Sequence, residues 1–174
     1  MVGSPPGGVG MNGEPHANRP WMPGYGILGP EEGTGLRPWP WARDRLERAR
    51  TYWVATTGPD GRPHAMAVWG LWLDDRFLFS SDLRSRKVRN LTADSRSAIT
   101  AEVEQDALTV EGTAGRSTDE EQYRRFAQAY DAKYGWKLES DTYPLFVVRP
   151  QVVFAFSMDD FVGSATRWRF GPEQ

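Results

Sequence analysis

Hydrophobic and polar positions alternate over short stretches of most of the chain beyond residue 50, and this pattern predicts β-strands. Half-buried strands show a period of two and are rich in Val, Ile, Thr and aromatic residues. The turn sequence GPDG at 58–61 joins the first two predicted strands as a hairpin. The predicted strands are 52–57, 63–73, 76–81, 97–103 and 107–114, followed by strand material in YPLFVVRPQVVFAFSM and by the closing segment TRWRF.

Helical periodicity interrupts these strands. WARDRLERARTYW predicts a short helix that leads into a strand, with Leu46 and Ala49 on one face. A second helix of about three turns is predicted over 85–94. Short antiparallel strands with inserted helices are typical of a small β-barrel, so the expected fold class is mainly β with α additions.

The strongest predicted helix lies in STDEEQYRRFAQAYDAKYG. Ser117 and Glu120 match a capping box at its start, and Gly135 matches a C-terminal stop. One face of this helix carries aromatic side chains, which we expect to pack in the core: Tyr123, Phe126, Tyr130 and Tyr134.

Residues 1–38 form a segment of different composition that holds ten of the chain's 18 glycines. Such a stretch supports neither a regular helix nor a central strand. We expect its first part to be mobile, whereas RPWMPGYGILGP should lie as an extended arm on the folded body or on a second subunit. The motif GYGILG within it matches the dinucleotide pattern GxGxxG, but flanking prolines exclude the required strand and helix. Residues 39–174 are then the single folded domain.

Composition excludes several kinds of site. The 174 residues carry a net charge of −2, contain no cysteine and include two histidines, His16 and His64. Disulfides and thiolate chemistry are therefore absent, and we expect neither a metal site nor a Ser-His-Asp site. The acidic pI near 5.7 argues against a nucleic-acid partner. The chain lacks an apolar run of membrane length and a signal peptide, which predicts a cytoplasmic protein without a membrane partner.

Four cations gather where a strand gives way to a helix, in FSSDLRSRKVRNL. With Ser85 as the N-cap, Arg86 and Lys87 fall in the first helical turn, where unpaired N–H groups and the helix dipole favour a bound anion. Arginine and lysine side chains can flank the same phosphate. The alternative interpretation is a solvated basic face, and the spacing alone does not decide between them.

The strand predicted at 63–73 has a possible ligand-binding pattern. It carries Trp69 and Trp72 around Gly70, and glycine inside a strand often marks a bulge or a close approach to a ligand. The backbone N–H groups of such a strand could recognise the edge of a flat heterocycle. The alternative is that the two tryptophans pack on opposite faces of a barrel wall.

Four pieces of the sequence together resemble the flavin and deazaflavin oxidoreductases of the pyridoxamine 5′-phosphate oxidase-like split-barrel family, in particular its actinobacterial deazaflavin branch. They are YWVATTGPDGRPHAMAVWGLWL, FSSDLRSRKVRNL, VEGTA and TRWRF. The resemblance implies a six-stranded antiparallel split β-barrel with two or three peripheral helices. It also implies a homodimer with a cofactor groove between the subunits.

The same resemblance implies roles for particular residues. The cofactor phosphate would be held by Ser80, Ser81, Arg86 and Lys87, with Ser85 as the helix cap. The ring would lie along the backbone from Met66 through Val68 to Trp69. Trp168 and Arg169 would approach from the other subunit. No catalytic side chain is identified, although His64 and Tyr25 are candidates for a proton donor.

Departures from the family pattern bear on the reaction. The strand HAMAVWG lacks the further Arg and Lys of oxidases that make pyridoxal phosphate, Ala107 replaces an expected glutamine, and TRWRF lacks the Arg-x-His pair. We therefore expect an oxidoreductase that uses reduced coenzyme F420 to transfer a hydride to a planar, electron-poor small molecule. The alternatives are an FMN-dependent oxidase or reductase, a non-catalytic flavin or haem carrier, and a structural dimer with an empty groove.

Overall fold

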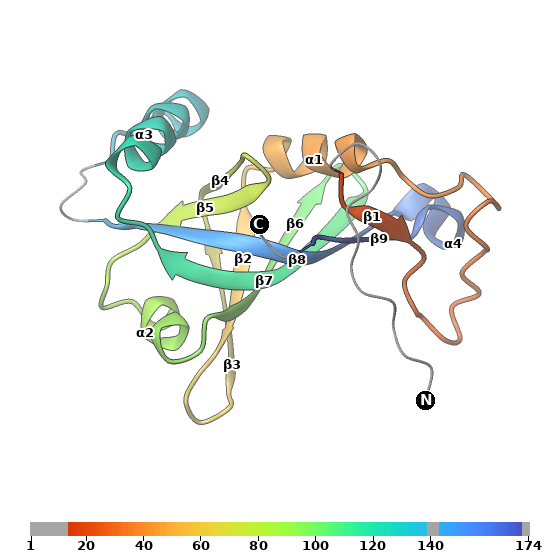
Figure 1. Ribbon diagram of the computed structural model, residues 1–174, viewed down its shortest axis with the longest axis horizontal. Helices are drawn as coiled ribbons and strands as arrows, with labels where there is room; N and C mark the ends of the chain where they lie inside the picture. Colours follow the sequence, from red (N-terminus) through yellow and green to blue (C-terminus); the bar gives the residue numbers. More distant parts are fainter. Residues whose placement is uncertain (1–13, 139–142, 172–174) are drawn as a thin grey trace.

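The body of the protein is one antiparallel sheet with helices at its periphery (Figure 1). The computed structural model describes residues 14–138 and 143–171. In these ranges the strands are β1 (His16–Asn18), β2 (Tyr52–Thr57), β3 (Pro63–Val68), β4 (Gly70–Leu73), β5 (Arg76–Ser80), β6 (Arg96–Val103), β7 (Asp106–Arg116), β8 (Leu145–Ser157) and β9 (Thr166–Arg169). The helices are α1 (Trp39–Arg48), α2 (Arg86–Ala93), α3 (Glu120–Tyr134) and α4 (Phe161–Ser164), with a 3-10 turn at Met158–Asp160.

Strand β8 is the central strand of the sheet and pairs with three other strands. One of its edges pairs with β7 over almost its whole length. Its other edge is shared, because Leu145–Val148 pair with β5 whereas Val152–Ala155 pair with β9. This division of one edge between two strands gives the split barrel, and the main strand order is β1-β9-β8-β7-β6-β2-β3. Strand β3 therefore lies at a sheet edge, on a hairpin that projects from the body (Figure 1).

A proline in the middle of β8 is accommodated by a bulge. Pro150 cannot donate a ladder hydrogen bond, and it lies opposite Gly112, where the register of β7 shifts between Glu111 and Gly112. A Cβ atom at Gly112 would stand 2.1 Å from the carbonyl oxygen of Arg149. Only glycine lets the two backbones approach this closely, so β8 continues as a single strand.

Two apolar clusters hold the sheet and the helices together. The main cluster lies inside the sheet under α1 and α2, and its largest members include Trp39, Trp72, Phe77, Phe79 and Trp168. A smaller cluster fixes α3 to β4, β5 and β8. Its members are Leu71, Leu78, Phe126, Tyr130, Leu145 and Val147. The aromatic face of α3 thus packs as its periodicity predicts, with Phe126 and Tyr130 buried.

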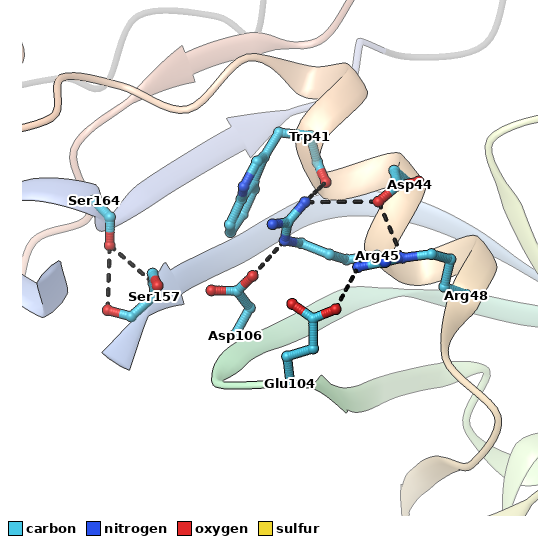
Figure 2. Close-up of polar contacts among 8 residues, drawn as sticks. All are labelled: Trp41, Asp44, Arg45, Arg48, Glu104, Asp106, Ser157 and Ser164. Atoms are coloured by element: carbon cyan, nitrogen blue, oxygen red, sulfur yellow. Dashed lines mark hydrogen bonds and ion pairs between the residues drawn. The ribbon is translucent and has the colours of Figure 1, made fainter. Parts of the chain in front are cut away.

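A buried ion pair attaches α1 to the start of β7, as Figure 2 shows. The Arg45 guanidinium donates to the Asp106 carboxylate and lies 4.0 Å from the centroid of the Trp41 ring. Only 8% of the Asp106 side chain is exposed, and Arg45 compensates for the burial of this carboxylate. Arg48, one turn later, instead pairs at the surface with Asp44 and with Glu104.

The mainly β fold with peripheral helices is as predicted, but the number of strands is not. The described residues form nine strands where six were expected. The predicted strand 63–73 is divided at Trp69 into β3 and β4, because β3 pairs with β2 whereas β4 turns to pair with β5. Strand β1 and helix α4 were not anticipated, since proline and glycine dominate the first region and only a few residues form the second.

Helix α3 also starts differently from the prediction. Its N-cap is Asp119, whose carboxylate accepts a hydrogen bond from the Gln122 amide at 3.0 Å, so the capping box of Ser117 and Glu120 is wrong. The Ser117 hydroxyl accepts from the Asp119 amide at 3.2 Å and so supports the turn before the helix. The stop at Gly135 is confirmed by its left-handed backbone, with φ of 66°.

Part of the glycine-rich first segment lies along the body. β1 pairs with β9, and the Arg19 guanidinium donates to the carbonyls of Gly29, Glu32 and Ala165. The segment GYGILG forms neither helix nor strand. The mobility expected for the beginning of the chain concerns residues 1–13, which lie outside the described residues. Among the helices that the structure describes, none combines the length and apolar character of a membrane span.

Candidate functional site

A groove of about 380 Å³ lies where the end of β3 meets the end of β5. Such a volume falls within the range of small-molecule sites. The groove brings together three of the residues expected to bind a cofactor, Val68, Trp69 and Ser80. Its lining residues are Thr51, Ala67, Val68, Trp69, Ser80 and Tyr130.

One wall of the groove is aromatic. The Trp69 ring is 46% exposed and stacks on Tyr134, with ring centroids 4.9 Å apart and planes 2° from parallel. Tyr130 contacts the same indole at 6.4 Å. Trp72 is by contrast buried in the core, so the two tryptophans do face opposite sides of the wall. The exposed face of Trp69 is thus held in a fixed orientation beside the open edge of β3.

Gly70 has a packing role rather than a ligand-binding one. A Cβ atom there would stand 2.4 Å from the Phe77 ring and 2.8 Å from the Leu78 carbonyl oxygen. The Tyr134 hydroxyl donates to the Gly70 carbonyl at 2.8 Å and accepts from its amide at 3.3 Å. The close approach inferred from the sequence is therefore made by the neighbouring strand and by α3.

The serines between β5 and α2 form a local hydrogen-bonded unit. Ser85 is the N-cap of α2, as predicted, and its hydroxyl accepts from the Val88 amide at 3.4 Å. The Ser81 hydroxyl is within 3.1 Å of the Ser85 hydroxyl. The Ser80 hydroxyl donates to the Tyr143 carbonyl at 2.9 Å. These bonds order the turn between the groove-lining Ser80 and the start of α2, and α2 itself packs on β2 and β3.

The four cations of this segment fall into two classes. Arg84 pairs with Asp82 at 2.9 Å, and this bond lowers the pKa of Asp82 to about 2. The Arg89 guanidinium donates to the Arg84 carbonyl. The side chains of Arg86 and Lys87, in contrast, make no hydrogen bond or ion pair with any residue that the structure describes. The two cations that the sequence places in the first helical turn are therefore those left without a partner.

Lys87 is half-buried without a counter-ion, and burial lowers its pKa. The charged form is therefore less stable there than in water. A bound anion would reverse this effect, because an opposite charge favours the protonated amine. The Val88 amide is capped by Ser85, whereas the amides of Arg86 and Lys87 have no acceptor within the helix and add to the same positive field. Arg86, Lys87 and these amides fit a phosphate group.

The remaining predicted residues lie elsewhere. Met66 is 47% exposed on β3 but does not line the groove. Trp168 and Arg169 are on β9, at the opposite end of the sheet order from β3. Trp168 is fully buried in the core against Trp39, which is at odds with its expected approach to a cofactor across a subunit interface. Arg169 has a buried Nε without a hydrogen-bond partner among the described residues.

Neither candidate proton donor lines the groove. His64 is half-buried on β3, with a buried Nδ1 that has no partner among the described residues. Tyr25 packs edge-on against Phe161, with centroids 5.7 Å apart, and is 61% exposed. The described part of the chain also holds no cluster of three acidic or histidine side chains able to bind a metal.

Sequence reasoning missed the contribution of α3 to the site. Tyr130 lines the groove and Tyr134 supports Trp69, although the aromatic face of α3 predicted only core packing. The pairing of Trp69 with Tyr134 joins residues from two distant segments. The sequence signal for this contribution was the length of the aromatic face of α3. That face continues beyond the buried Phe126 and Tyr130 to Tyr134, which is only half-buried.

Comparison with known proteins identifies the family. Residues 39–157 match the pyridoxamine 5′-phosphate oxidase family model. A pyridoxine/pyridoxamine 5′-phosphate oxidase from Rubrobacter xylanophilus is 41% identical over 78 residues, which make up 42% of this chain and 36% of that protein. The matched segment thus spans about a third of the length of this curated relative.

Solved structures share the fold. An F420 reductase has a TM-score of 0.55 and 24% identity, with 64% of this chain and 94% of that chain covered. A haem-binding protein from Mycobacterium smegmatis has a TM-score of 0.58 and 21% identity, with 69% of this chain and 55% of that chain covered. The split sheet and the groove define the class of split-barrel proteins. Within that class, the chain belongs to the pyridoxamine 5′-phosphate oxidase family.

Proposed function

We propose that this protein is an oxidoreductase that uses reduced coenzyme F420 to transfer a hydride to a planar, electron-poor small molecule, with FMN as the alternative cofactor. The observation that carries the proposal is the pair of unpartnered cation side chains, Arg86 and Lys87, at the capped start of α2, six and seven residues after the groove-lining Ser80. Membership of the family and the fold shared with an F420 reductase support it.

The phosphate of the cofactor would bind at the start of α2. Arg86 offers a planar pair of donors and Lys87 a compact charge, and the hydroxyls of Ser80, Ser81 and Ser85 shape the turn that positions them. Both F420 and FMN carry such a phosphate. The same anchor therefore serves either cofactor.

The ring of the cofactor would lie along β3. The outer edge of this strand has no partner strand in the described chain, so its backbone N–H and C=O groups are available to the edge of a heterocycle. Val68 and Trp69 line the groove beside this edge. When bound, the cofactor supplies the hydride chemistry. The exposed Trp69 face provides an apolar surface that favours a planar substrate and displaces water.

Binding titrations on the apo-protein test this proposal. We expect F420 to bind with a low-micromolar Kd and FMN to bind more weakly, with fluorescence as the readout. The variant Arg86→Ala/Lys87→Ala should weaken cofactor binding by ~3 kcal/mol, about 150-fold, taking ~1.5 kcal/mol for each charge-assisted contact. Binding that is unchanged in this variant would contradict the phosphate site, and the cations would then be a solvated face.

The control variant is Arg96→Ala/Arg124→Ala, which removes the same net charge. Both arginines are exposed and paired, with Asp94 and with Glu121. We expect this variant to bind the cofactor within about two-fold of the wild type, because distant exposed charges are screened by salt. Equal losses in both variants would show a general charge effect instead of a site at α2.

The two cofactors can be separated by a further pair of cations. Coenzyme F420 carries an acidic tail that FMN lacks, and Arg84 and Arg89 lie on the same stretch as the phosphate anchor. If they bind the tail, Arg84→Ala/Arg89→Ala weakens F420 binding more than FMN binding. Binding of FMN alone would change the assignment to a flavin oxidase or reductase.

A further inference from the structure

A second cavity, of about 610 Å³, lies between α1, β4 and α3. Figure 1 shows these two helices flanking the β4–β5 hairpin, and both contact β4. The cavity is separate from the groove beside β3, and the two share no lining residue. Its walls are mostly apolar and include one amine: Glu47, Leu71, Trp72, Leu73, Asp74, Ala129, Ala132 and Lys133.

The Lys133 amine is held in a defined position at this cavity. Its Nζ donates to the Glu47 carbonyl at 2.9 Å and to the Tyr52 hydroxyl at 3.2 Å. The Tyr52 hydroxyl donates its own proton to the Leu46 carbonyl, so it accepts from the lysine. A neutral amine has two N–H groups, and both bonds can therefore be kept without the third proton. The lone pair of the neutral amine is then left for another group.

The surroundings of Lys133 favour its neutral form. Burial is the largest cause that lowers the pKa of Lys133 to about 8, and Arg50 adds to it. The Glu47 carboxylate and the rings of Tyr52 and Tyr134, 5.3 and 5.4 Å from Nζ, favour the charged form. Asp74 also lines the cavity, but it pairs with Arg125 at 2.8 Å.

We propose that Lys133 is a reactive amine that binds a small apolar aldehyde reversibly, as an imine, in the cavity between α1, β4 and α3. The amine nitrogen bonds to the carbonyl carbon, and proton transfer to the oxygen gives a carbinolamine. The C–O bond then breaks and water leaves with the aldehyde oxygen and two amine hydrogens, so that a C=N bond remains. The reaction needs no oxidant or reductant, and the apolar side chains Leu71, Leu73 and Ala129 contact the rest of the aldehyde.

Reactivity should exceed that of an ordinary lysine at neutral pH. With a pKa of about 8, roughly a quarter of Lys133 is neutral at pH 7.5, against about one in a thousand for an unperturbed lysine. A less basic amine is also a weaker nucleophile, and the net advantage is about ten-fold. The chain contains two internal controls, since its other lysines are Lys87 and Lys137. Lys137 is exposed, and Lys87 is half-buried outside this cavity.

The experiment treats the full-length protein with benzaldehyde and sodium cyanoborohydride, and maps the reduced adducts by mass spectrometry of peptides. We expect Lys133 to be labelled about ten-fold faster than Lys137 at pH 7.5, with a half-maximal rate near pH 8. Its rate should saturate with benzaldehyde concentration, whereas the rates at Lys87 and Lys137 should rise linearly. Labelling of Lys133 no faster than Lys137, or without saturation, would overturn the proposal.

A variant provides a second readout. Lys133→Arg keeps a cation and its donors but forms no imine, so saturable labelling should disappear while labelling of Lys137 is unchanged. Saturable labelling that persists in this variant would also overturn the proposal. The outcome is independent of the proposed cofactor, because neither Arg86 nor Lys87 lines this cavity.

Discussion

Tyr134 is the residue that connects the two sites. Its ring supports Trp69 in the groove at 4.9 Å and also lies 5.4 Å from the Lys133 amine. Its hydroxyl lies 3.0 Å from the Arg50 carbonyl oxygen and 2.8 Å from the Gly70 carbonyl oxygen, so its single proton can be donated to either acceptor. Burial, its largest cause, raises the pKa of Tyr134 to about 12, so the hydroxyl remains a donor at neutral pH. One side chain at the end of α3 thereby supports Trp69 at the groove and also lies close to the Lys133 amine.

The lowered pKa of Lys133 should be visible in the pH dependence of unfolding. In the folded state the pKa is about 8, whereas an unfolded lysine has about 10.4. Between these values the unfolded chain binds more protons, so stability rises with pH and is lost as pH falls through 8. Urea denaturation gives the free energy of unfolding of the wild type and of Lys133→Met at pH 7 and at pH 9.5. From pH 7 to pH 9.5 the wild type should gain ~1 kcal/mol relative to the variant, a value that is discounted because the amine is half-exposed.

Two tyrosines make the free energy of unfolding fall as pH rises, but they do so above the range of pH 7 to 9.5. The raised pKa values of Tyr52 and Tyr134, both caused mainly by burial, mean that folding opposes their ionisation. Their contribution falls only above about pH 10, where unfolded tyrosines lose their protons. A difference between wild type and Lys133→Met that is the same at pH 7 and pH 9.5 would therefore contradict the lowered lysine pKa.

At the scale of elements, α1 provides two arginines with different expected effects. Arg45→Ala leaves the Asp106 carboxylate buried without its partner, and we expect a loss of about 3–5 kcal/mol in the free energy of unfolding. Arg48→Ala, on the same helix, removes exposed pairs and should cost less than about 1 kcal/mol. Chemical denaturation of both variants measures the difference, and similar losses would contradict a specific role for the buried pair.

The sequence predicted those elements whose signals are local. Ser85 caps α2 and Gly135 ends α3, since each acts on its own helix, and strand β2 coincides with the predicted 52–57. Prediction failed where a partner distant in sequence decides the structure. The division at Trp69 depends on β4 pairing with β5, and strand β1 exists because β9 offers it an edge.

The candidate site was predictable to a similar extent. The position of Arg86 and Lys87 in the first turn of α2 follows from the Ser85 cap. The sequence did not indicate that Arg84 and Arg89 would have partners of their own, because Asp82 and a backbone carbonyl become partners only in the folded turn. The family resemblance implied that Trp168 approaches the cofactor from the other subunit, and its burial against Trp39 depends on packing with a helix more than a hundred residues away.

At the scale of the whole molecule, the β2–β3 hairpin exposes large apolar side chains, Trp53 on one face and Met66 on the other. Trp53, Met66 and Trp69 are each about half-exposed, with 52%, 47% and 46% of their surfaces accessible. Large exposed apolar side chains near an open strand edge mark an association surface. We expect a homodimer with a mass of about 39 kDa, twice the 19.6 kDa of the chain.

Sedimentation equilibrium tests this expectation. The variant Trp53→Glu/Met66→Glu should dissociate toward the monomer because it places a charge at an exposed apolar position on each face of the hairpin. The variant Trp21→Glu is the matched control, since Trp21 is 84% exposed on the first segment, away from this hairpin. A monomeric wild type, or dissociation of both variants, would contradict a dimer formed through the hairpin.

The shared edge of β8 has a consequence for synthesis on the ribosome. β5, β7 and β9 all pair with β8, which follows every other described strand except β9 in the chain. Strands β4–β5 and β6–β7 can form hairpins as they emerge, but they wait for Leu145–Ser157 before they can join into one sheet. Until then their unpaired strand edges and their apolar faces are exposed to other nascent chains. A ribosome that stalls before residue 145 should therefore carry a chain that binds chaperones and resists compaction, whereas a chain whose β8 and β9 have both emerged should be folded.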